Sequence, residues 1–129
     1  MTIQEPSTVG LTKAAHDKLK RLKDDGHFGE LQDAYRFAIS LAVAQGIDPF
    51  SIPSEGSRTT IFNVGTLDPD QSIKVAINAV YSDACNNEAA YKIAERLAEW
   101  GVGELSMEAS RGDINFVKLL QQANEKLTG

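Results

Sequence analysis

Few side chains in this sequence have the types and spacing that catalysis or metal binding requires. The two histidines, His16 and His27, are not at the spacing of zinc ligands on one helix, and the chain has neither an HExxH motif nor a cysteine pair. Gly101 and Gly103 follow a predicted helix rather than a strand, which argues against a dinucleotide-binding loop. The single Cys85 has no basic neighbour in sequence, so we interpret it as a structural thiol. We therefore expect no catalytic residue, no metal, no cofactor and no enzymatic activity.

A run of basic residues near the start of the chain is the candidate surface for binding DNA. Its members are Lys13, Lys18, Lys20, Arg21 and Lys23. Such a run is usually a solvated helix face, and the alternative is a contact surface for an anionic partner. The net charge of −5 arises after residue 30, and this acidic excess argues against broad, non-specific binding of nucleic acid. DNA binding is therefore an alternative that we do not favour.

Four further residues are candidates for an interface with another chain: Arg36, Phe50, Ile61 and Phe62. Asp33 and Arg36 are three residues apart on the narrow polar strip of a very apolar helix, so they are expected to pair. In such surroundings Arg36 either forms an internal ion pair or faces another subunit or an anionic ligand. Phe50, in a long loop, either ties the loop to the core or exposes a small apolar patch.

The periodicity of apolar residues predicts five helices. The central one, over residues 31–45, is apolar on nearly every side and is expected to lie in the core. Asp68, followed by Pro69, is expected to cap the third helix directly. The other predicted helices cover residues 12–25, about 88–100 and 114 to about 127, with a loop at 46–58 and a connector at 104–110.

Residues 59–64, TTIFNV, form the one convincing strand. Because a lone strand is not stable, it pairs with a strand around residues 7–9, pairs with a second copy of the chain, or is merely extended. A strand without an evident partner in a helical chain favours a dimer.

These elements predict a mainly α fold in which about five helices and one short strand, residues 59–64, pack together. We expect a flexible N-terminal arm over residues 1–10 and a single helical domain over 11–129. The sequence shows no signal peptide and no apolar run long enough to cross a membrane, and its single cysteine fits a reducing compartment. We therefore expect a cytoplasmic protein that does not bind membranes.

Residues 12–47 show a resemblance to a known group of proteins. The matching positions are Leu19, Leu22, Phe28, Asp33, Tyr35, Phe37 and Ala38. They resemble a pattern in small bacterial proteins associated with DNA phosphorothioation systems and, more distantly, the two helices of ribbon-helix-helix proteins. Ribbon-helix-helix proteins read bases with the strand before the first helix, and residues 6–10 contain no Arg or Lys. The resemblance therefore implies a fold more than a mode of base reading.

Three functions follow from the sequence. The favoured one is a non-enzymatic helical interaction protein that self-associates as a dimer or binds another protein, as an accessory of a bacterial DNA-modification or defence system. The second is a DNA-binding protein or transcriptional regulator that uses the basic first helix. The third is a small enzyme or ligand binder, which predicts a deep, polar-lined cavity near the 46–58 loop.

Overall fold

The computed structural model describes residues 4–52, 58–116, 118, 119 and 121. Within these residues it confirms a mainly α fold, with five α-helices and one two-stranded sheet. The elements are β1 (Thr8–Thr12), α1 (Lys13–Asp24), α2 (Leu31–Ala44), the short 3-10 helix η1 (Pro49–Ser51), β2 (Arg58–Asn63), α3 (Val64–Leu67), α4 (Ser72–Val80), the 3-10 helix η2 (Ala84–Asn86) and α5 (Ala90–Ser110). None of the described helices is long and apolar enough to span a membrane.

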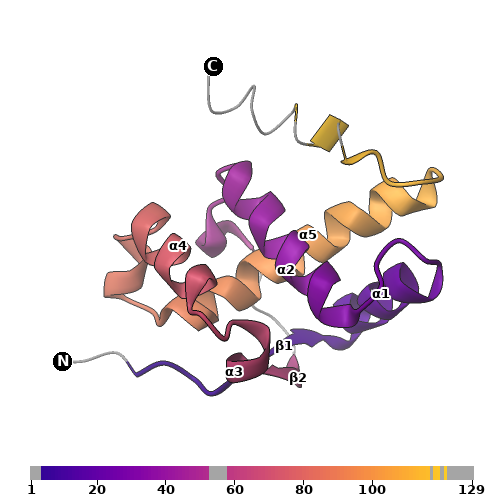
Figure 1. The fold of residues 1–129 in the computed structure, drawn as a ribbon. Coiled ribbons are helices and arrows are strands. Elements are labelled where there is room, and N and C mark those ends of the chain that lie inside the picture. Colours follow the sequence, from indigo (N-terminus) through magenta and orange to yellow (C-terminus); the bar gives the residue numbers. More distant parts are fainter. Residues whose placement is uncertain (1–3, 53–57, 117, 120, 122–129) are drawn as a thin grey trace.

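Helix α5 is the element on which the others pack. It runs through the middle of the molecule, with α4 near one end and α1 near the other (Figure 1). It contacts α1, α2, α4 and β1. Its buried residues recur every three or four positions, as the core face of a helix should: Ile93, Ala94, Leu97, Ala98, Val102 and Leu105. The predicted central helix, α2, supplies the facing side of the core with Ala34, Tyr35, Ala38 and Ala42.

The prediction that a helix ends at Gly101 and Gly103 is wrong, because α5 continues through both glycines to Ser110. A Cβ atom on Gly101 would collide with the backbone carbonyl of Ala38 in α2. The glycine therefore lets two helices approach closely instead of ending one of them. The connector expected at 104–110 is the last part of the same helix.

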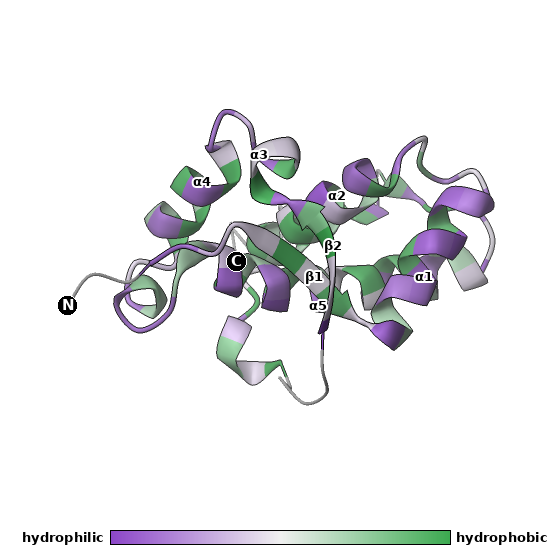
Figure 2. Ribbon diagram, turned by 90° about the horizontal axis from the view of Figure 1, so that it is seen from below, coloured by the Kyte–Doolittle hydropathy of each residue, from purple (hydrophilic) through white to green (hydrophobic). Residues whose placement is uncertain are grey.

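The strand predicted at 59–64 pairs within the chain. β1 and β2 are antiparallel, with Thr8 opposite Asn63, Thr12 opposite Arg58 and an irregularity between Val9 and Gly10. The resulting ribbon lies along one side of the helical part (Figure 2). Residues 8–10, assigned to a flexible arm, instead form this strand, and Val9 and Gly10 are buried. The argument for a dimer from an unpaired strand therefore no longer applies.

Two glutamates of α5 cover the outer edge of β1. The Gly10 N–H donates to Glu95 Oε2 (2.8 Å), and the Thr12 N–H donates to Glu99 Oε1 (3.1 Å). The hydroxyl of Thr12 also donates to Glu99 Oε2 (2.6 Å). The two carboxylates thus take the place of a neighbouring strand along an edge that would otherwise be unpaired.

The boundaries of the first two helices are close to those predicted, and Thr12 caps α1 through a hydrogen bond from the Ala15 N–H (3.3 Å). The third predicted helix begins later than expected, at Ser72, because the chain turns through a left-handed backbone conformation at Gln71 (φ 61°). For the last predicted helix, residues 116, 118, 119 and 121 are helical, whereas residues 122–127 lie outside the described part of the chain.

Candidate functional site

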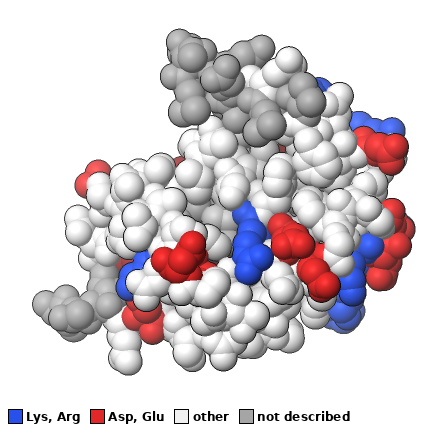
Figure 3. Space-filling model, in the orientation of Figure 1, with Lys and Arg blue, Asp and Glu red and all other residues white. Residues whose placement is uncertain are grey.

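The five basic candidates for DNA binding are all exposed, but acids lie among them. Asp17 pairs with Lys13 (3.3 Å), and Asp24 and Asp25 are exposed at the end of α1. Figure 3 accordingly shows basic and acidic side chains next to each other at the α1 end of the molecule. The mixture weakens any continuous positive potential over this helix.

Arg36 forms the expected internal ion pair, with its Nη1 atom 3.4 Å from Asp33 Oδ1. Its Nε and Nη2 atoms donate to the carbonyl oxygens of Leu67 (2.8 Å) and Thr66 (3.2 Å). The guanidinium therefore satisfies carbonyls at the end of α3. These contacts use three of the five N–H donors of the guanidinium within the chain.

The other three predicted interface residues differ in their exposure. Phe62 is only 9% exposed, and its ring packs on that of Tyr35 with centroids 5.1 Å apart, so its prediction as an interface residue is wrong. Ile61 is half-buried against the core. Phe50 is 49% exposed, and the guanidinium of Arg96 lies 5.4 Å from its ring centroid. Of these three residues, Phe50 alone remains a surface feature.

The structure exposes a set of apolar residues on α4 that the sequence did not single out as an interface. We call Val75, Ala76, Ala79 and Val80 the α4 ridge. Val75 is 65% exposed and Val80 is 54% exposed, while Ile77 is the one fully buried residue of this helix. The apolar residues of this segment recur at helical spacing, at Ile73, Ala76, Ile77, Val80, Tyr81 and Ala84, which predicts one apolar face. Ala76 and Val80 nevertheless face solvent. An apolar surface helix of this kind is typical of an interaction site.

A groove lies beside the ridge, between α4 and α2. Its centre is a cavity of about 290 Å³ without a charged lining residue, formed by Ile39, Ser40, Val43, Ala44, Ser72, Ile73, Ala76 and Ile77. A second cavity, of about 530 Å³, shares Ser40, Ser72 and Ile73 with the first and extends the space towards Arg36 and Asp70. We call the two together the α2–α4 groove.

A buried carboxylate holds α4 in place. Asp68 is 3% exposed and accepts hydrogen bonds from the backbone N–H groups of Ile73 (3.0 Å) and Lys74 (3.1 Å). The hydroxyl of Tyr91 in α5 donates to Asp68 Oδ2 (2.8 Å). Burial and, next, this hydrogen bond raise the pKa of Tyr91, so the phenol stays protonated. Asp68 therefore does not cap the helix directly, as predicted, because α4 begins at Ser72; it instead accepts N–H groups of the first turn from four residues before the helix and ties that turn to α5.

The third function predicted a deep cavity near the 46–58 loop, and the structure has a shallower one there. This cavity of about 440 Å³ lies between η1 and the chain after α4. Its lining residues are Gly46, Asp48, Pro49, Phe50, Val80, Tyr81, Ser82, Asp83, Ala84 and Asn87. Most of them are exposed, so the cavity is an open depression. We call it the η1 cavity.

The remaining candidates for reactivity are a metal site and the single thiol, Cys85. No group of three or more His, Cys, Asp and Glu side chains among the described residues is arranged to hold a metal ion. Burial and, to a lesser degree, the charge of Glu5 raise the pKa of the Cys85 thiol, which makes it less reactive at neutral pH. Comparison of the chain with known protein families, curated proteins and solved structures found no match.

Proposed function

We propose that this chain is a non-enzymatic interaction protein that self-associates through the α4 ridge and the α2–α4 groove. The observation that carries the proposal is the exposure of four neighbouring apolar residues on a helix that is fixed to the core by Asp68. Most of the area of Val75 and Val80 is open to solvent. Covering each valine is worth about 1 kcal/mol, and a two-fold dimer counts each contact twice.

A second copy fits this surface because ridge and groove lie side by side. Under a two-fold axis the ridge of one copy enters the groove of the other, and the reverse contact forms at the same time. Ala76 and Ala79 have small side chains, which allow two helix backbones to approach closely. The centre of the groove has no charged lining residue, so two acidic chains can meet there without burying like charges.

Sedimentation equilibrium over a series of protein concentrations tests this proposal. We expect a monomer–dimer equilibrium for the wild-type protein and a monomer for the variant V75E/A79E, whose new carboxylates would be buried without partners. Both positions are exposed, so thermal unfolding of the monomer should change little.

The matched control is Met107→Glu, because Met107 is also exposed (50%) but lies on α5. It should dimerise as the wild-type protein does. A wild-type chain that stays monomeric at every concentration, or a V75E/A79E variant that dimerises normally, would contradict the proposal.

A role as an accessory of a bacterial DNA-modification or defence system is part of the same proposal and rests on the resemblance of residues 12–47. The alternative, DNA binding by α1, is tested by repeating the mass measurement with duplex DNA. A complex that salt dissociates and that K20E/R21E abolishes would favour that alternative.

A further inference from the structure

The η1 cavity carries negative charge and has no cation among its lining residues. Asp48 Oδ1 accepts a hydrogen bond from the Phe50 N–H (2.9 Å), and Oδ2 has no hydrogen bond within the described residues. Asp83 forms no ion pair in the same part of the chain and is exposed. The cavity therefore attracts cations and repels anions.

The walls of the cavity are aromatic and aliphatic. Phe50, Val80 and Tyr81 line it together with the two carboxylates. The ring of Phe50 already accepts one cation, since the guanidinium of Arg96 lies 5.4 Å from its centroid. Glu88 neutralises that guanidinium at 3.3 Å, so Arg96 does not balance the charge of Asp48 and Asp83.

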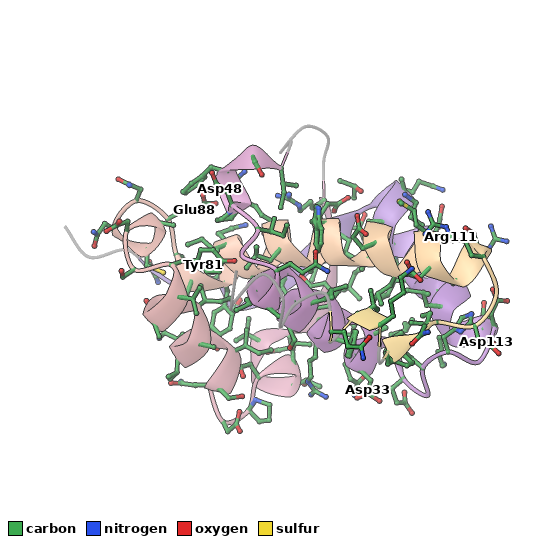
Figure 4. All side chains as sticks on the ribbon, turned by 90° about the horizontal axis from the view of Figure 1, so that it is seen from above. Asp33, Asp48, Tyr81, Glu88, Arg111 and Asp113 are labelled. Atoms are coloured by element: carbon green, nitrogen blue, oxygen red, sulfur yellow. The ribbon has the colours of Figure 1, made fainter. Side chains whose placement is uncertain are left out.

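Asp48 and Tyr81 lie close to each other at one end of the molecule (Figure 4). The charge of Asp48, after burial, raises the pKa of Tyr81. The Tyr81 hydroxyl donates to the Ile47 carbonyl oxygen (2.8 Å), which fixes the phenol ring as one wall of the site. A carboxylate beside an aromatic wall is the combination that recognises an ammonium group on an apolar body.

We infer that the η1 cavity binds a small organic cation, a primary amine with an aromatic or aliphatic body. The ammonium group lies between the carboxylates of Asp48 and Asp83, and the body lies against Phe50 and Val80. A volume of about 440 Å³ is within the range of small-molecule sites. The site is open, so binding is weak, on the order of millimolar. Because Val80 belongs both to this site and to the α4 ridge, amine binding and self-association compete for that side chain, and each proposal has its own test.

An NMR titration of the isotope-labelled protein tests the inference, with benzylamine as the cationic probe and benzyl alcohol as its neutral counterpart. We expect benzylamine to shift the backbone amide signals of Gly46, Phe50, Ser82 and Asn87 in a saturable way. Benzyl alcohol should bind at least about tenfold more weakly, because it lacks the ammonium charge. Equal binding of the two probes, or no shifts at these amides, would overturn the inference.

Variants separate a specific site from general attraction to an acidic protein. D48N/D83N should weaken benzylamine binding at least about tenfold, whereas D33N/D113N, with the same change in charge away from the cavity, should bind as the wild-type protein does (Figure 4). Phe50→Leu should also weaken binding, because it keeps an apolar side chain but removes the ring. Equal losses in the two double variants would overturn the inference. If D48N/D83N does not fold, Asp83→Asn alone takes its place in the comparison.

Discussion

Asp68 shows how much of the architecture can depend on one buried carboxylate. It accepts two backbone N–H groups of α4 and the hydroxyl of Tyr91. In Asp68→Asn, the amide group turns a donor towards groups that are donors themselves, so we expect the free energy of unfolding to fall by about 1–3 kcal/mol. Denaturant unfolding measures this loss. Asp113→Asn, at an exposed position, is the control and should change stability little, and an equal loss there would contradict the role of Asp68.

The tyrosines give the protein a predictable response to alkaline pH. Burial is the first cause that raises the pKa of Tyr35, Tyr81 and Tyr91. The folded protein therefore holds these protons more tightly than the unfolded chain. The resulting stability is fully present below the ordinary tyrosine pKa of about 10 and is lost as pH rises through the raised values. Thermal unfolding at increasing alkaline pH should show this loss. If the three tyrosines of the folded protein instead ionised at the ordinary tyrosine pKa of about 10, as followed by tyrosinate absorbance, the prediction would be contradicted.

At the scale of elements, the crossing of α2 and α5 depends on Gly101. A Cβ atom there would collide with the backbone of Ala38, which cannot move aside as a flexible side chain could. We expect Gly101→Ala to lower the free energy of unfolding by at least about 2 kcal/mol. The control is Gly103→Ala in the same helix, where nothing lies within 4 Å of the added Cβ atom.

Gly103→Ala should stabilise the protein by about 0.5–1 kcal/mol, because alanine favours the helix over the unfolded chain. Circular dichroism during denaturant unfolding measures both variants. Similar effects of the two substitutions would show that helix propensity, rather than contact with α2, governs position 101.

At the scale of the whole molecule, charge and apolar surface are separated. The basic and acidic residues of α1 are mixed at one end, whereas the α4 ridge near the other end has no charged residue. Self-association through the ridge should therefore persist at high salt, since screening reduces the repulsion between two chains of net charge −5. DNA binding would show the opposite dependence. The sedimentation series at low and high salt thus distinguishes the two functions.

The sequence by itself determined the features that depend on neighbouring residues. The apolar spacing of α1 and α2, the capping hydroxyl of Thr12 and the Asp33–Arg36 pair each involve groups within four residues, and all are present. The β-branched composition of residues 59–64 likewise sufficed to predict a strand there. Local geometry fixes such features whatever the rest of the chain does.

Only the tertiary structure decided the features that depend on distant partners. In the sequence Gly101 suggests the end of a helix, whereas in the structure it allows α2 to pack closely against α5. Likewise, the strand at 59–64 has no evident partner in the sequence, and the fold brings residues 8–12 beside it. Similarly, an apolar stripe on α4 does not reveal which of its residues the core covers, so the exposure of Val80 was not predicted. A cavity near the 46–58 loop was predicted, but its open shape and the residues that α4 and the following chain contribute to it depend on the tertiary structure. Periodicity records which residues share a face of a helix, but burial depends on what packs against that face.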